Sequence, residues 1–495
     1  MNALNAHLPA LQVIVPMLMA PFVVLLRARS LPWAAATATS LLAFAVAIQL
    51  TLIVMDGSPM TYQMGSWAAP YGIELQVDAL SALVLLVVTG ASSVALLGGR
   101  DSLTAIISAD REPYFFAAWL LALAGMAGIV VSADAFNIFV FMEISSLASY
   151  VLIAGGPDRR ALPATFKYLV MGTIGATFYL IGVGLIYMMT GTLNLGDMEL
   201  RIHEVADQKP ILAAAGFITV GLALKAAIFP LHVWLPNAYT YAPHMVTAFL
   251  AACATKVSLY VLLRFDFFVF QQNLAGHEFQ FAAYLMPLAI LGILVGSTVA
   301  MFERNIKRML AFSSVAQIGY MMLGASLVTA TGLTAATLHM FNHALAKGGL
   351  FLAVAAIAVI AAGYRLSDIA GLARRMPWTF AALIVAGLSL IGVPGTAGFI
   401  SKWYLINAAL ELETGGVALV ALILISSLMA VVYVWRIVEA AYFGEPAEQR
   451  ATPVPPALVI ILWAVAIANI GFGVAPDLPL SLSATAADIL LGHVQ

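Results

Sequence analysis

Apolar residues run along this chain in stretches of about twenty, separated by short segments that contain glycine, proline or charge. Stretches such as 82–97 and 419–434 show no alternation of hydrophobic and polar positions, so they predict helices rather than the strands of a transmembrane barrel. The pattern predicts about fourteen membrane-spanning helices. Their ranges are 8–26, 31–54, 77–98, 113–131, 134–154, 163–190, 210–239, 243–266, 281–301, 306–328, 332–361, 376–410, 416–442 and 455–476.

Composition strengthens this interpretation, because 63% of the 495 residues are hydrophobic and only 9% are charged. A soluble domain has about 25% charged residues. So few charges cannot cover a water-facing surface, and the fold class is therefore an all-α polytopic membrane protein. The net charge of −2 also gives no reason to expect a nucleic-acid partner.

The distribution of lysine and arginine predicts the orientation. If the N-terminus is outside, the outside loops hold only Arg201, Lys209 and Arg264. The inside loops then hold Arg27, Arg29, Arg100, Arg111, Arg159, Arg160, Lys167, Arg304, Lys307, Arg308, Arg365, Arg374, Arg375, Arg436 and Arg450. Residues 1–26 lack the basic start of a cleaved signal peptide, so we expect a retained first helix in the plasma (bacterial inner) membrane, with its N-terminus outside.

The sequence lacks the motifs that bind most cofactors. Cys253 is the single cysteine, so the chain can form neither an intrachain disulfide nor a cysteine-ligated iron–sulfur cluster. Glycine-rich nucleotide-binding motifs and zinc- or iron-ligand spacings are also missing. We therefore expect no bound cofactor and no metal.

Five charged residues fall inside the predicted spans: Lys225, Lys256, Lys347, Lys402 and Glu143. A charge at the centre of a membrane helix costs about 2.5–3.5 kcal/mol on insertion scales, unless it pairs or faces water. Snorkelling from a helix end explains a residue such as Lys167 but not a group in the middle of a span. Structural ion pairing is a further alternative, and a transport function is the favoured one.

Histidines add to this set. "HMFNHALAKGGLFL" places His339, His343 and Lys347 four residues apart, and so on one face of a helix. Two histidines and a lysine on one apolar helix are typical of a hydrated proton path. His232 and His244 flank Pro236, and for each of them a structural and a functional role remain open.

Two spans carry helix-breaking residues. "LKAAIFPLHVWLP" has Pro230 five residues after Lys225, and "GVPGTAGFISKW" has Pro394 and neighbouring glycines before Lys402. Each break is the fourth helix of a block of five, and an odd number of spans inverts the second block relative to the first. We therefore expect an N-terminal three-helix segment (1–112), two inverted five-helix repeats (113–266 and 281–442), and a C-terminal helix with a tail (455–495).

These motifs resemble the superfamily of antiporter-like membrane subunits found in Mrp-type cation/proton antiporters, respiratory complex I and membrane-bound hydrogenases. The resemblance covers nearly the whole chain and is most specific from 77 to 404. It rests on "VDALSALVLLV", "FNIFVFMEISSLASYVLI", "ALKAAIFPLHVWLPNAYTYAPHMVTAFLAACATKVSLYVLLRF", "NIKRMLAFSSVAQIGYMMLG", "HMFNHALAKGGLFL" and "GVPGTAGFISKWYL". Among its members, the chain looks most like the D subunit of an Mrp antiporter.

The resemblance implies roles for the buried charges. Glu143 and Lys225 would form a switching pair, Lys256, His343 and Lys347 would relay protons, and Lys402 would end the line, with His339 and His232 as weaker candidates. The implied partners are other membrane subunits, protons, and Na⁺ or K⁺. The chain would have no catalytic chemistry of its own.

Three alternatives remain open. A proton-pumping subunit of an NADH:quinone oxidoreductase or membrane hydrogenase would have flavin and iron–sulfur partners. A stand-alone secondary transporter would need a roomy substrate cavity and would work without partners. A self-contained membrane enzyme is the least favoured, because no nucleophile stands beside a base in a loop.

Overall fold

The structure is a computed structural model that describes residues 3–28, 30–57, 59–271, 281–445, 450 and 453–493. Arg29, one of the arginines assigned to the inside loops, lies outside these residues. In the N-terminal half, the elements are α1 (Ala3–Ala6), α2 (Leu8–Leu25), α3 (Leu31–Asp56), β1 (Met60–Gln63), η1 (Met64–Ser66), β2 (Glu74–Val77), α4 (Ala79–Thr104), α5 (Glu112–Val131), α6 (Ala135–Ala154), α7 (Ala161–Thr190), α8 (Leu195–Val205) and α9 (Lys209–Ala226). The remaining elements are α10 (Leu235–Tyr241), α11 (His244–Leu263), η2 (Arg264–Gln271), α13 (Phe281–Phe302), α14 (Ile306–Ser326), α15 (Ala330–Ile360), η3 (Leu366–Ile369), η4 (Leu372–Arg374), α16 (Pro377–Ile391), α17 (Ala397–Leu410), α18 (Gly416–Phe443), α19 (Pro456–Val474) and α20 (Asp477–Leu490).

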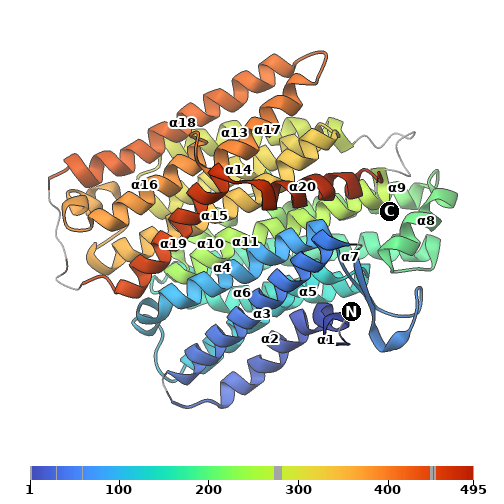
Figure 1. Ribbon diagram of the computed structural model, residues 1–495, viewed down its shortest axis with the longest axis horizontal. Helices are drawn as coiled ribbons and strands as arrows, with labels where there is room; N and C mark the ends of the chain where they lie inside the picture. The colour runs from blue at the N-terminus through green and yellow to red at the C-terminus, as the bar shows by residue number, and fades with distance from the viewer. Residues whose placement is uncertain are drawn as a thin grey trace.

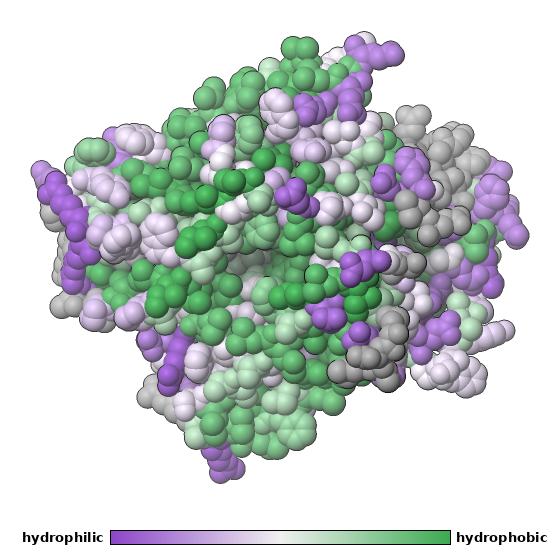
Figure 2. All heavy atoms as spheres, viewed as in Figure 1, coloured by the Kyte–Doolittle hydropathy of each residue, from purple (hydrophilic) through white to green (hydrophobic). Residues whose placement is uncertain are grey.

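The molecule is a bundle of long helices that run roughly side by side (Figure 1). In the described chain, thirteen helices are long and apolar enough to cross a membrane, or up to fourteen if α16 and the bent helical turns before it count as one span. Figure 2 shows hydrophobic residues over the middle of the visible face and hydrophilic ones mostly toward the ends of the helices. The predicted fold class, an all-α polytopic membrane protein of about fourteen helices, is confirmed.

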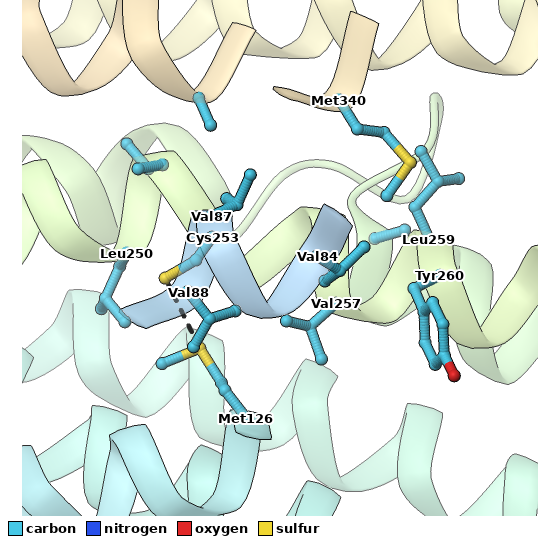
Figure 3. Close-up of a cluster of buried hydrophobic side chains, with 14 of the residues drawn as sticks. Val84, Val87, Val88, Met126, Leu250, Cys253, Val257, Leu259, Tyr260 and Met340 are labelled. Carbon is cyan, nitrogen blue, oxygen red and sulfur yellow. Dashed lines mark hydrogen bonds between the residues drawn. The ribbon is translucent and has the colours of Figure 1, made fainter. Parts of the chain in front are cut away.

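Apolar side chains fill the space between the helices. Figure 3 shows one such cluster, where Cys253 of α11 lies beside Met126 of α5 and valines of α4, with a sulfur–sulfur distance of 3.6 Å. The Cys253 thiol also donates to the Phe249 carbonyl at 2.9 Å, so the cysteine is a buried packing residue. Long α15 occupies the centre of the bundle, in contact with α4, α11, α14, α16, α17, α19 and α20.

Both predicted helix breaks are present. The seventh predicted helix, 210–239, ends at Ala226 as α9, and an irregular segment leads to the short α10. Pro230 lies inside this break, whereas Pro236 is in the first turn of α10, where a missing N–H costs nothing. The twelfth predicted helix, 376–410, is divided into α16 and α17 by a turn at Gly392, which adopts a left-handed conformation with φ of +90°.

The two five-helix blocks repeat one backbone detail, which we call a clasp. In the first clasp, Asp134 before α6 forms an antiparallel bridge with Asn194, which follows α7. In the second, Asn305 before α14 forms the same bridge with Arg365, which follows α15. Asp134 and Asn305 each cap the next helix by accepting a backbone N–H three residues on. Because corresponding clasp residues are separated by the same interval along the chain, the clasps mark equivalent points of two related units.

Helix packing follows the same plan in both blocks. The first helix of each block contacts the second and the fifth: α5 packs on α6 and α11, and α13 packs on α14 and α18. The third helix packs on the broken one, with α7 against α9 and α15 against α16 and α17. The N-terminal helices α2, α3 and α4 lie against α5, and the segment after 476, predicted only as a tail, forms α20 along α15 and α4.

Candidate functional site

Lys225 and Glu143 meet beside the first break. Lys225 lies in the last turn of α9 with a 5% exposed side chain, and its Nζ is 3.3 Å from Glu143 Oε1 in the middle of α6. Nζ also donates to the Ser146 hydroxyl at 2.8 Å. The Glu143 side chain is 29% exposed, so this ion pair joins a buried ammonium to a partly exposed carboxylate.

Backbone groups at the end of α9 find partners within the break. Ala227 takes a left-handed conformation after α9, and the following amides bond back to Ala223 and Leu224. The Leu224 carbonyl also accepts the Trp234 indole N–H at 2.9 Å. The Leu224 carbonyl, next to Lys225 in the chain, is therefore held by protein.

Lys256 lies in the middle of α11 and is 1% exposed. Its Nζ donates to the Ala251 carbonyl of the same helix at 2.6 Å. In the part of the chain that the structure describes, no carboxylate lies within ion-pair distance of this lysine. A buried lysine with neutral partners is one that can exist without its proton at modest cost.

The predicted face of α15 forms as expected. The rings of His339 and His343 are nearly parallel, with centroids 6.1 Å apart. His339 bonds to Ser401 of α17 through Nδ1 and to Gln317 of α14 through Nε2, each at 2.8 Å. Lys347, fully buried, donates to the Leu310 carbonyl at 2.6 Å and to the Ser313 hydroxyl of α14.

His343 differs from its neighbours on this face. It is 2% exposed, and neither ring nitrogen has a hydrogen-bond partner among the described residues. Buried polar atoms in proteins are nearly always paired with protein or ordered water. Both ring nitrogens of His343 are therefore buried without a protein partner among the described residues.

Lys402 occupies the second break. From α17 its Nζ reaches back to the end of α16, donating to the Ile391 carbonyl at 2.8 Å and the Leu390 carbonyl at 3.2 Å. It also donates to Ser427 of α18 at 2.9 Å. An ammonium at these free carbonyls is favoured by the helix dipole. Each break thus holds one lysine, at the end of the first half-helix in α9 and on the second half-helix in α17.

His232 and His244, whose roles the sequence leaves open, lie in different surroundings. His232 stacks on Phe229 within the first break, with ring centroids 5.3 Å apart. His244 begins α11 and shares a 2.9 Å hydrogen bond with the Tyr364 hydroxyl. Lys307, predicted in an inside loop, is instead 1% exposed and donates to the Ala242 carbonyl at 2.8 Å.

One buried ion pair escapes sequence reasoning. Arg264, predicted in an outside loop, is buried in η2 and pairs with Asp78, which caps α4 and is 1% exposed. Ser81 and Tyr260 complete the hydrogen bonds of this pair. The charge of Asp78 at the start of an apolar span was the available signal, but its partner is far away in the sequence.

Residues 132–430 match the family model described as NADH:quinone oxidoreductase/Mrp antiporter, transmembrane. The chain belongs to this family. It is 42% identical to the N subunit of the NADH-quinone oxidoreductase of Desulforudis audaxviator, over 92% of this chain and 90% of that one. It is 30% identical to the D subunit of the Na⁺/H⁺ antiporter of Alkalihalophilus pseudofirmus, over 88% of each chain.

Solved structures agree with this assignment. A chain of the Mrp complex from Dietzia superposes with a TM-score of 0.89 at 28% identity, covering 99% of this family member and 98% of that chain. A chain of the archaeal membrane-bound sulfane sulfur reductase has a TM-score of 0.89 at 31% identity, and the match covers 98% of this chain and 97% of that one. A chain of respiratory complex I from Thermus thermophilus has a TM-score of 0.72 at 27% identity, and the match covers 97% of this chain and 99% of that one. The protein is therefore an antiporter-like, multi-pass membrane protein.

Proposed function

We propose that this chain is the proton-translocating subunit of a multisubunit Na⁺/H⁺ (monovalent cation/proton) antiporter, and that protons move along Glu143, Lys225, Lys256, His343, Lys347 and Lys402. The observation that carries the proposal is this set of buried lysines, three of which bond only to carbonyl and hydroxyl oxygens among the described residues. Burial disfavours their charged forms, so each can hand on a proton.

The Glu143–Lys225 contact acts as the switch in this proposal. With the contact made, the carboxylate favours a protonated Lys225. When it separates, the buried ammonium loses its counter-charge and releases a proton toward Lys256. His343 and Lys347 relay the proton, with His339 and His232 in supporting places, and Lys402 ends the line.

The proposal also includes the division of the chain into domains and its location in the cell. Residues 1–112 form an N-terminal segment, 113–266 and 281–442 the two inverted repeats, and 455–495 the C-terminal part; the two clasps support this division. The protein lies in the plasma (bacterial inner) membrane, N-terminus outside, among other membrane subunits. Similarity to chains of the Mrp, sulfane sulfur reductase and complex I assemblies supports such partners.

A second candidate is a proton-pumping subunit of an NADH:quinone oxidoreductase, which the 42% identity to an N subunit of such an enzyme favours. Purification of the intact complex in mild detergent, with the subunits identified by mass, separates the two. Small antiporter subunits support the antiporter, and flavin and iron–sulfur subunits support the oxidoreductase.

Replacement of the switch residues tests the proposal in either setting. Glu143→Ala and Lys225→Ala should each abolish ion-gradient coupling, measured by the quenching of a pH-sensitive dye in membrane vesicles that contain the whole complex. Glu411→Gln, at an exposed carboxylate after α17, is the control and should retain coupling. Wild-type transport by both switch variants at normal expression would contradict the assignment.

A further inference from the structure

An apolar groove lies away from the buried lysines, on another side of α15. It has a volume of about 480 Å³ and is lined by α3, α4, α11, α15, α19 and α20. In Figure 1, α3 and α4 lie on one side of this region and α19 and α20 on the other. Its walls consist entirely of hydrocarbon, aromatic and glycine positions, among them Phe44, Leu86, Ala95, Gly348 and Phe472. A cavity with such walls stays dry, so its occupant must be apolar.

The dimensions of the groove fit one hydrocarbon chain. Along α4 the lining extends from Leu86 to Ala95, which is ~13 Å at 1.5 Å per residue. A volume of about 480 Å³ over that length leaves a cross-section of roughly 37 Å².

An arginine lies on α4 beyond one end of the groove. Arg100 is exposed, five residues past Ala95, which is the last residue of α4 that lines the groove. Its guanidinium lies 5.0 Å from the Trp33 ring centroid, and the Trp33 indole N–H donates to the Leu96 carbonyl at 2.9 Å. Tryptophan and arginine together are typical of the headgroup level of a membrane.

The distance along α4 from Leu86, at the inner end of the groove, to Arg100 agrees with a position of Arg100 at the headgroup level. From Leu86 to Arg100 the helix rises ~21 Å. Half of a bilayer, measured through its headgroups, is ~20–22 Å. A lipid whose phosphate lies at Arg100 would therefore reach the inner end of the groove with its acyl chain.

We propose that this groove is a binding site for one acyl chain of an anionic phospholipid, with its phosphate bound by Arg100. The apolar walls recognise the chain and the guanidinium recognises the phosphate, which it can bind through two parallel hydrogen bonds. The inference is independent of the proton pathway, because the groove uses Phe341, Ala344, Leu345 and Gly348 of α15 rather than the face with His339, His343 and Lys347.

Glycine positions provide a matched pair of variants. A Cβ at Gly348, which lines the groove, meets no atom within 4 Å, so Gly348→Phe places its side chain into the groove. Gly184 of α7 also has open space and is exposed on the outside of the bundle, so Gly184→Phe adds the same bulk elsewhere.

Native mass spectrometry of the full-length chain, titrated with phosphatidylglycerol, tests the proposal. Gly348→Phe should weaken binding at least tenfold, and Gly184→Phe should bind like wild type. Arg100→Gln should weaken binding about tenfold, the effect expected for a lost charged hydrogen bond, and Arg100→Lys should restore most of it.

A measurement on the wild-type protein does not depend on any variant folding. Phosphatidylglycerol should bind at least fivefold more tightly than diacylglycerol, which has the same chains without phosphate, and more tightly than zwitterionic phosphatidylcholine. Equal binding of these three lipids, unchanged binding in Gly348→Phe, or retention of an isoprenoid quinone in their place would overturn the proposal.

Discussion

At the scale of single residues, the buried lysines are held by different kinds of partner. Lys225 has a carboxylate and a hydroxyl, whereas Lys256, Lys347 and Lys402 have carbonyl and hydroxyl oxygens. A carboxylate favours the charged form of a lysine, whereas a neutral oxygen accepts a hydrogen bond from the ammonium and from the neutral amine alike. In the proposed pathway, the carboxylate of Glu143 therefore favours a charged Lys225, and the other three lysines have no such counter-charge among the described residues.

Ser146 offers a mild way to perturb the Glu143–Lys225 contact. Removing a hydrogen bond to a charged group costs about 1.5–3 kcal/mol. Ser146→Ala should therefore shift the Glu143–Lys225 switch and lower proton transport several-fold in vesicles. Ser149→Ala, which removes a hydroxyl that donates only to the Ser145 carbonyl in the described structure, should transport like wild type. Equal activities in the two variants would exclude a role for this hydroxyl.

The Asp78–Arg264 pair makes a different prediction, about stability. Breaking a buried ion pair by removing one partner costs about 3–5 kcal/mol, because the other charge stays buried. Asp78→Asn should clearly lower the unfolding temperature of the detergent-solubilised protein. Asp158→Asn, which breaks an exposed pair with Arg160, should change it little, since exposed pairs contribute about 0–1 kcal/mol. A normal melting curve for Asp78→Asn would contradict this account.

Residue-level surroundings were only partly predictable. The sequence identifies Lys225, Lys256, Lys347, Lys402 and Glu143 as charges inside the membrane spans, because a charge stands out in an apolar run. It assigns Arg264 and Lys307 to loops, because each lies near the end of an apolar run, and does not reveal that both are buried. Their burial depends on distant partners, Asp78 and the Ala242 carbonyl, and such pairing has no local signal.

At the scale of elements, the second break depends on glycine. Gly392 and Gly395 both have positive φ, at +90° and +86°. A Cβ on Gly392 would also lie 2.7 Å from Cδ of Lys402, while one on Gly395 meets no atom within 4 Å. The two positions share their backbone strain and differ in their contact with the lysine.

Alanine at these positions separates the two effects. Strain from a left-handed alanine costs about 1–2 kcal/mol at either site. Gly392→Ala should in addition displace Lys402 from the carbonyls of α16 and reduce transport more strongly than Gly395→Ala, at equal protein levels in the membrane. Equal transport by the two variants would mean that the position of Lys402 at the break is unimportant.

The breaks could be predicted from the sequence, but their shapes could not. Pro230 and the glycines around Pro394 rule out continuous helices. The sequence does not show that α9 already ends at Ala226, because alanine is a strong helix former and gives no signal for the left-handed conformation of Ala227. In the same way, α20 is amphipathic and short, and becomes a recognisable element only against α15 and α4.

At the scale of the whole molecule, the proposed orientation can be tested with thiol labelling. Cys253 is fully buried, so the native background should be silent toward a membrane-impermeant maleimide. Tyr71, 88% exposed, follows the second span, and exposed Ser108 follows the third. With the N-terminus outside, Tyr71→Cys should be labelled in intact cells and Ser108→Cys only after the membrane is opened. The reverse pattern would invert the topology.

The clasps carry a consequence for how the chain is made. Proteins are synthesised from the N-terminus, and early parts fold while later ones are still being added. Asn194 is synthesised before Lys225, and Arg365 before Lys402, so in each unit both clasp residues are available before the lysine of the broken helix. Biosynthesis thus makes both clasp residues of each helix hairpin available before the charged, broken segment is complete.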